Sequence, residues 1–297
     1  MIRARVSSTL TTRLYSQLVR VWLALVAGAA VCATASGSVS RHAVEQAIKG
    51  VVQAQFSYDY VPGSFRFWNQ RIRIRRAGTI LLDSPVRPLS AEDEVDPGFF
   101  REKKSVAVDD LDGDGEAEVA LYLYLGGAHC CWYTQVYRYG LPTNSYSFST
   151  HVWGNTAAHT ADLDHDGKPE FVSADDRFSY QFTDFADSAW PVQIWAFRAG
   201  VFSDVTRRFL VAIRTDARRQ WRSVSSRGAD GVRRRAVLAA WTADECLLGR
   251  CTQAFAKVAA LRRAGKLAVR LACPCDPSAR RYVTHLRRFL RRTGYLR

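Results

Sequence analysis

Apolar and polar residues alternate along much of the middle of the chain. Phe65 and Phe67, then Ile72 and Ile74, lie before a turn at Ala77-Gly78, and the pattern resumes beyond it, which predicts a β-hairpin. From residue 105 onward, short apolar stretches are separated by Gly, Pro and Asn. We expect strands at 106–108, 117–125, 132–139, 145–153, 170–174, 178–182, 192–198 and 202–206. Many short strands divided by turns indicate a mainly β fold.

The two ends of the chain favour helices instead. Residues 41–56 space their apolar side chains as a helix does, so we assign 36–64 to an N-terminal helix and linker and 65–210 to the β domain. Residues 211–297 form a basic helical region. Within it, 237–265 favours one long helix or two helices broken at Gly249, and a last helix starts at Asp276-Pro277. Together they suggest a helical hairpin after an Arg-rich joining segment.

Residues 1–35 are typical of a Sec-type signal peptide. Arginines without acids precede an apolar run of about a dozen residues, and Ala33-Thr34-Ala35 offers a cleavage site. An uncleaved anchor is the alternative. Since no second apolar stretch reaches membrane length, we expect a secreted or cell-surface protein whose mature chain has no transmembrane segment.

Six cysteines follow the signal segment, and an even number in an exported protein predicts disulfides. They are Cys130, Cys131, Cys246, Cys251, Cys273 and Cys275. Cys246 and Cys251 can bridge if the chain turns at Gly249. Cys130 and Cys131 are expected to point to opposite faces of a strand and to pair with different partners. Metal ligation by either closely spaced pair is the alternative.

A nine-residue acidic motif, D-L-D-x-D-G-x-x-E, occurs twice, 52 residues apart. The first copy spans 110–118 and the second spans 162–170, and each precedes an apolar stretch. Repetition at a fixed distance indicates an array of similar units. Two solvated acidic turns are the alternative interpretation.

The spacing of these acids fits a hard cation. Ca²⁺ takes six to eight oxygen ligands, and carboxylates at positions 1, 3 and 5 can converge on it while a glycine at position 6 makes the sharp turn. The residue at position 7 offers its backbone carbonyl oxygen, and the residue at position 9 offers a glutamate carboxylate. We therefore predict two Ca²⁺ sites, formed by Asp110, Asp112, Asp114, Glu116 (carbonyl) and Glu118, and by Asp162, Asp164, Asp166, Lys168 (carbonyl) and Glu170.

This motif between strands resembles the FG-GAP repeat, also called the VCBS repeat, of integrin α-chain β-propellers and many exported bacterial proteins. The resemblance covers roughly residues 65–210, and its specific part is the two acidic loops. It implies propeller-blade-like antiparallel β-sheets that carry calcium in those loops.

Charge is unevenly distributed and suggests two regions with different partners. Residues 36–200 carry a net charge of −7 and residues 201–297 a net charge of +17. Anionic wall polymers, phospholipid headgroups or the acidic β domain itself fit the basic region, and export argues against intracellular nucleic acid. The alternative to a binding role is that these arginines simply form a solvated surface.

Known catalytic signatures such as G-x-S-x-G, H-E-x-x-H and the P-loop are absent from the sequence. We therefore expect a non-enzymatic, calcium-binding β-repeat protein that acts as a binding or surface-interaction module, with a glycan or an anionic polymer as its ligand. The alternative is a secreted hydrolase that contains structural calcium, with glycans as its candidate substrates.

Overall fold

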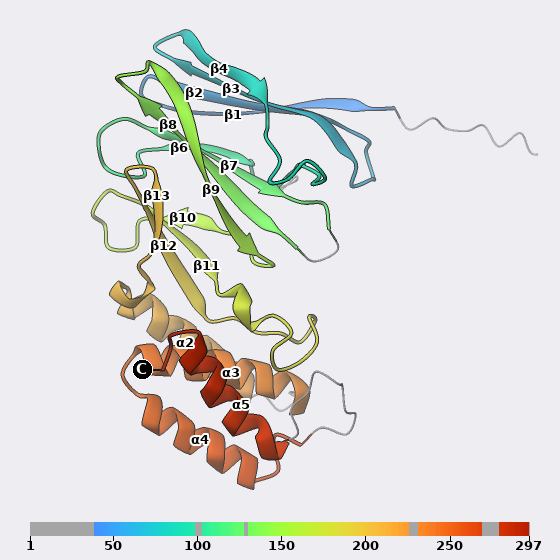
Figure 1. Ribbon diagram of the computed structural model, residues 1–297, viewed down its shortest axis with the longest axis vertical. Coiled ribbons are helices and arrows are strands. Elements are labelled where there is room, and N and C mark those ends of the chain that lie inside the picture. Colours follow the sequence, from blue (N-terminus) through green and yellow to red (C-terminus); the bar gives the residue numbers. More distant parts are fainter. Residues whose placement is uncertain (1–38, 99–102, 128–129, 226–230, 269–278, 297) are drawn as a thin grey trace, which may run out of the picture. The chain divides into compact units, whose positions relative to one another are not determined.

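The computed structural model describes residues 39–98, 103–127, 130–225, 231–268 and 279–296, and Ser40–Arg297 form one compact unit. The signal segment expected at 1–35, together with Cys273 and Cys275, lies outside the described residues. Antiparallel sheets followed by helices make up the unit (Figure 1). The prediction of a mainly β protein with a C-terminal helical region is confirmed.

The described strands form three antiparallel sheets in which most neighbours are consecutive along the chain. The first sheet contains β1 (Arg41–Lys49), β2 (Val52–Tyr60), β3 (Phe67–Arg76) and β4 (Thr79–Pro85). The second contains β5 (Asp96–Pro97), β6 (Val106–Asp109), β7 (Glu118–Tyr124), β8 (Trp132–Gly140) and β9 (Ser145–Gly154). The third contains β10 (His159–Ala161), β11 (Glu170–Ala174), β12 (Val192–Arg198) and β13 (Val201–Asp204). These sheets are not closed into a propeller within the described ranges.

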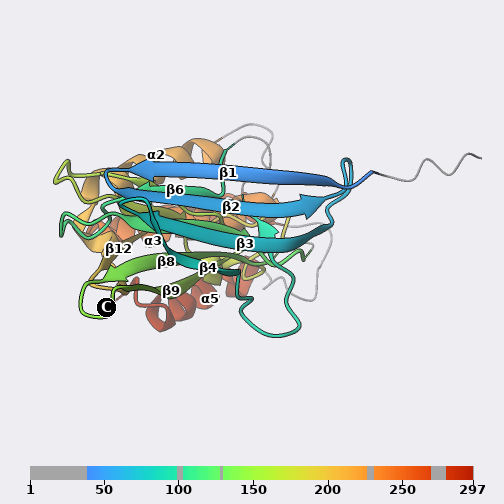
Figure 2. The ribbon, with the colours of Figure 1, turned by 90° about the horizontal axis from the view of Figure 1, so that it is seen from above.

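The second sheet is the middle layer, because β7 is buried on both faces. Val119, Leu121 and Leu123 pack in one cluster with side chains of the first sheet. Ala120 and Tyr122, which point the other way, pack with side chains of the third sheet. Seen from above, β1, β2 and β3 run side by side over this middle sheet (Figure 2). An uninterrupted apolar run in β7 is what a strand covered on both sides requires.

The N-terminal helix expected at 36–64 is wrong, since β1 and β2 form a hairpin there. The alternation that decides the structure lies in β2, where Val52, Ala54, Phe56 and Tyr58 are buried and their neighbours are not. In β1, Val44 and Ile48 are exposed, so the helical spacing that includes them does not mark a buried face. The hairpin expected around Ala77-Gly78 is confirmed as β3 and β4.

The C-terminal region has more helices than the expected hairpin. The described residues form α2 (Leu210–Ser225), α3 (Gly231–Leu247), α4 (Cys251–Arg263) and α5 (Ala279–Arg292). The segment interpreted as an Arg-rich joining segment is therefore largely helix α2. Its apolar positions Ile213, Ala217 and Val224 fall on one buried face, which the surrounding arginines obscure in the sequence.

The helices pack onto the β region through a shared core. Phe178 and Phe182 belong to the same buried cluster as residues of α3 and α5, and Phe289 meets the Phe178 ring edge-on with centroids 4.8 Å apart. The strand expected at 178–182 is therefore wrong: the 3₁₀ turn η1 (Asp176–Phe178) and further turns insert these rings between helices. Polar contacts reinforce the docking, as when the Tyr295 hydroxyl donates to Asp175 over 2.9 Å. None of the described helices is both long enough and apolar enough to span a bilayer.

Candidate functional site

The two acidic loops occupy equivalent places in two successive sheets. The first loop (110–118) joins β6 to β7, and the second loop (162–170) joins β10 to β11. In both sheets the strands on either side of the loop pair with each other, and two further antiparallel strands follow. The repeat seen in the sequence therefore corresponds to a repeated structural unit.

Both loops are folded by the same hydrogen bonds between side chain and backbone. The position-1 carboxylates accept from the glycine at position 6, at 3.1 Å from Gly115 to Asp110 and 3.1 Å from Gly167 to Asp162. The position-9 glutamates accept from the residue at position 2, at 2.8 Å for Glu118 and 3.3 Å in the second loop. These glycines have φ angles of +88° and +82°, which residues with a Cβ rarely adopt.

Each loop gathers three carboxylates that could hold a metal ion. One oxygen from each of Asp110, Asp112 and Glu118 lies within 4.8 Å of the others, and the same holds for Asp162, Asp164 and Glu170. The position-5 carboxylates Asp114 and Asp166 are not part of these clusters. They accept instead from the backbone N–H at position 7, at 2.9 Å in both loops.

The position-7 side chains point away from the clusters, so only their backbone is available to a cation. The Glu116 carboxylate forms a bidentate pair with the Arg76 guanidinium at 2.9 Å. Lys168 lies against Gly113 of the first loop, where an added Cβ would come within 2.3 Å of its Cε. Both position-7 side chains are therefore engaged outside their own clusters.

Glu118 is the most deeply buried acid of the first loop, at 1% exposure. Burial raises the pKa of Glu118 to about 8, and the charges of Asp112, Asp114 and Asp110 add to this. Burial also raises the pKa of Glu170. One oxygen of Glu118, Oε1, is buried without a hydrogen-bond partner in the described structure.

Two arginines near the loops were missed in the sequence analysis. Arg138 on β8 contacts Asp112 at 3.0 Å and Asp114 at 2.5 Å, and approaches Glu118 at 3.8 Å. Arg198 on β12 contacts Glu170 at 3.1 Å and donates to the Leu111 carbonyl of the first loop at 2.6 Å. Each loop therefore receives positive charge from a neighbouring strand, from Arg138 in the first loop and from Arg198 in the second.

A shared sequence signal could have revealed these arginines. Both follow an aromatic residue and precede x-Gly, as Tyr137-Arg138-Tyr139-Gly140 and Phe197-Arg198-Ala199-Gly200. The first tetrapeptide ends β8, and the second begins within β12 and runs past its end. Each of these strands is the third of its meander and pairs with the strand after the acidic loop. The repeat thus contains a basic partner as well as an acidic loop.

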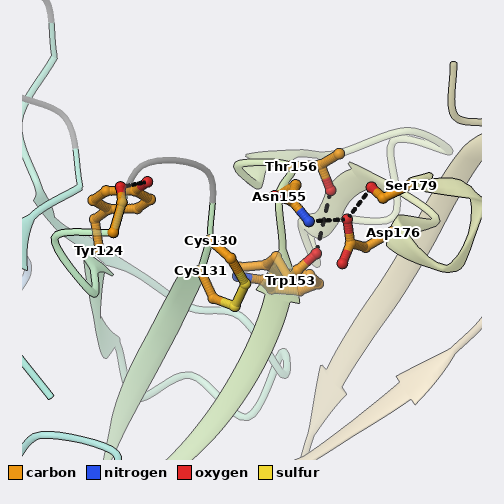
Figure 3. The surroundings of a disulfide bond; sticks show 9 residues. Tyr124, Cys130, Cys131, Trp153, Asn155, Thr156, Asp176 and Ser179 are labelled. Atoms are coloured by element: carbon orange, nitrogen blue, oxygen red, sulfur yellow. Dashed lines mark hydrogen bonds between the residues drawn. A yellow bond between two sulfur atoms is a disulfide. The ribbon is translucent and has the colours of Figure 1, made fainter. Parts of the chain in front are cut away.

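Four of the six predicted cysteines are paired in two disulfides. Cys246 and Cys251 bridge across the turn between α3 and α4, as expected. Cys130 and Cys131 are bonded to each other, beside Trp153 (Figure 3), so the prediction that they take different partners is wrong. They precede β8 and lie in a loop, so the alternation of side chains along a strand does not apply to them.

Comparisons with known proteins point to a different family from the one the loops resemble. Residues 213–294, which include most of the helical region, match the family model of the sll0997 C-terminal domain. A probable thylakoid lumen protein, sll0997 of Synechocystis sp., is 33% identical over 146 residues, or 48% of this chain and 43% of that protein. The match thus spans less than half of that relative. The assignment to FG-GAP or VCBS repeats is wrong, because the matching family and relative are of another kind.

A solved Xanthomonas protein, described as related to a type IV secretion system, is similar to this chain at 13% identity. The alignment covers 57% of this chain and 94% of that one with a TM-score of 0.15. A similarity at that level carries no structural or functional argument.

Proposed function

We propose that this chain is an exported, non-enzymatic binding module whose β region holds Ca²⁺ in its two acidic loops. The observation that carries the proposal is the repeated geometry: two loops with the same internal hydrogen bonds each gather three carboxylates, one of them buried. Three acids arranged in the same way in both loops are hard to explain as solvated turns, which place no such demand on side-chain geometry.

The residues present fit a hard cation. Glu118 uses Oε2 to accept from the Leu111 N–H, while its buried Oε1 has no donor among the described residues. Arg138 Nε lies 3.8 Å from this oxygen, beyond hydrogen-bond distance, so the buried carboxylate is only partly compensated and a cation beside it would complete its pairing. The clustered ligands are all oxygens, which Ca²⁺ prefers, and the carbonyls of Glu116 and Lys168 would complete each set.

Export is the second part of the proposal. The relative is described as a protein of the thylakoid lumen, a compartment that proteins enter by translocation, and the cysteines of the described region are paired. We therefore place this chain outside the cytoplasm, where Ca²⁺ would keep the β region folded around its two loops. Its ligand there is a glycan or another anionic polymer.

Calorimetric titration of the protein with Ca²⁺ tests the metal proposal. We expect two sites per chain, and a melting temperature that falls by several degrees when a chelator removes the ion in low-salt buffer, because a ligand bound to the folded state stabilises it. The double variant Asp110→Asn with Asp162→Asn keeps an acceptor oxygen in each loop and should lose both sites. Glu92→Gln, an exposed acid outside the loops, is the control. An unchanged melting temperature and no heat of binding would overturn the proposal.

A further inference from the structure

A groove on the helical region combines positive charge with two tryptophans. It has a volume of about 580 Å³ and lies between α2, α3 and α4. Its lining includes Arg214, Arg218 and Arg222 from α2, the rings of Trp221 and Trp241, and Lys257 from α4. We call this feature the arginine–tryptophan groove. Its volume falls within the range of roughly 300–1,000 Å³ that is usual for ligand sites.

The three arginines form a row along one face of α2. They are four residues apart, so successive Cα atoms are separated by about 6 Å along the helix axis. Within the described residues, none of the three has a hydrogen bond or an ion pair, and all three are exposed. Like charges four residues apart destabilise a helix, so folding alone gives no reason for this row. An anionic ligand would supply the missing partners.

The remaining charges of the groove do not cancel the row. Glu245, the acid in its lining, is held by Arg250 through two hydrogen bonds of 2.6 and 2.8 Å. The Lys257 ammonium lies 4.7 Å from the Trp221 ring centre and 5.4 Å from that of Trp241. Cation–π contact with two rings holds this exposed side chain in place, so its charge is positioned before any ligand arrives.

Trp221 also offers the groove an apolar surface. The ring centres of Trp221 and Trp241 are 4.6 Å apart, and Trp241 is buried while Trp221 is only partly covered. An indole beside cationic side chains suits a particular kind of ligand. Its rings would have an apolar face for the indole and negatively charged groups at their edges for the cations. A sugar ring with a carboxylate or sulfate group has this chemistry, because its C–H face can lie on an indole while arginine binds the acid in bidentate fashion.

We propose that the arginine–tryptophan groove binds an acidic oligosaccharide. This inference rests on the proposed role as a binding module and gives it a ligand class and a location, but it does not depend on calcium. Single-stranded nucleic acid fits less well, since it is bound on successive aromatic platforms and the groove offers one pair of rings.

The test uses the folded full chain and a hexamer of galacturonic acid, with neutral maltohexaose as the uncharged comparison. Calorimetric titration in 0.1 M salt should show binding of the acidic hexamer and not of the neutral one. The variant Arg214→Gln, Arg218→Gln, Arg222→Gln should weaken binding at least about tenfold, since three charge-assisted contacts are removed. A matched variant, Arg262→Gln, Arg263→Gln, Arg291→Gln, removes the same charge outside the groove and should bind within about twofold of the original protein.

Two further measurements distinguish a specific binding site from general charge attraction. Trp221→Ala keeps the net charge and should weaken binding several-fold, which simple charge attraction would not do. Chelation of calcium should leave the affinity for the hexamer unchanged below the melting temperature, so failure of the metal sites and failure of the groove are distinguishable. Circular dichroism confirms that each variant is folded.

The proposal is overturned by any of three results. Equal loss in the two triple-arginine variants would show non-specific attraction, and absence of binding by the original protein would remove the ligand class. Tighter binding of a dT12 oligonucleotide or of anionic phospholipid vesicles, abolished by the groove variant, would assign the groove to that other polyanion.

Discussion

The two acidic loops have the same backbone but different surroundings. In the first loop, the position-3 carboxylate of Asp112 accepts from Arg138 and, at 3.1 Å, from the Ala199 N–H. In the second loop, Asp164 is exposed and has no hydrogen bond or ion pair among the described residues. Positive charge thus reaches the position-3 carboxylate in the first loop, whereas in the second loop Arg198 contacts the position-9 Glu170 at 3.1 Å and leaves Asp164 open. A repeated motif does not guarantee equal sites, because neighbouring strands set the charge around each.

The comparison predicts a large and unequal effect of removing the position-3 charge. Asp164→Asn should weaken Ca²⁺ binding at the second loop by about a hundredfold, or roughly 2.7 kcal/mol, since it removes a carboxylate that is free to bind. Asp112→Asn should have a smaller effect at the first loop, because Arg138 and Ala199 already engage that side chain. Calorimetric titration resolves the two sites, with Glu92→Gln as the control. Equal losses at both loops would show that Arg138 does not compete with the ion.

Removing the competing arginine should strengthen the first site. We expect Arg138→Gln to raise its Ca²⁺ affinity by about tenfold, because a positive charge a few ångströms from the ion opposes binding. Arg75→Gln on β3, an exposed arginine without a hydrogen bond or ion pair in the described structure, is the matched control and should change nothing. An affinity that falls in Arg138→Gln would mean that this arginine organises the loop for the metal.

The position-6 glycines test whether the backbones are truly equivalent. Gly115→Ala and Gly167→Ala have open space around the added methyl group, so the cost comes from the positive φ alone. We expect each to lower the free energy of unfolding by about 1–2 kcal/mol, and by the same amount in the two loops. Urea denaturation measures both. A loss confined to one loop would break the equivalence.

The smallest expected effect comes from removing Arg76, which pairs with the position-7 side chain of the first loop. Arg76→Gln removes a partly exposed bidentate pair with Glu116 and a cation–π contact with Tyr139, so we expect only a small fall in melting temperature. Ca²⁺ affinity should stay within about twofold, because Glu116 is expected to offer the ion only its backbone oxygen. A strong loss of affinity would show that the Glu116 carboxylate itself takes part.

Local patterns were sufficient to predict much of the β region. The strands at 170–174 and 192–198 were predicted at their observed limits, because alternation and flanking turn residues are local signals. The helix predicted around β1 was wrong for a physical reason. Val51 lies in a hairpin turn and Ile48 is exposed, so their helical spacing is accidental. The strand predicted at 178–182 was wrong because packing against α5 determines where the aromatic rings of this segment lie. No local sequence pattern shows that packing.

The candidate site was predictable in its acids but not in its arginines. The spacing of Asp110, Asp112 and Glu118 is a local property of one loop, and the structure brings these side chains together. Arg138 reaches them from a different strand, and Arg198 reaches the first loop from a different sheet. Such contacts depend on how strands pair and sheets stack, which the sequence alone does not reveal.

The order of strands within the sheets has a kinetic consequence. Each sheet is assembled mainly from consecutive strands joined by short connections, as in β1 to β4 and β10 to β13. Contacts of this kind join residues close in sequence, and low contact order favours rapid folding. We expect each sheet to form as soon as its own segment becomes available, with the stacking of the layers as the slower, later step. A chain that crosses a membrane unfolded could thus rebuild itself in order, from its first sheet to its helices.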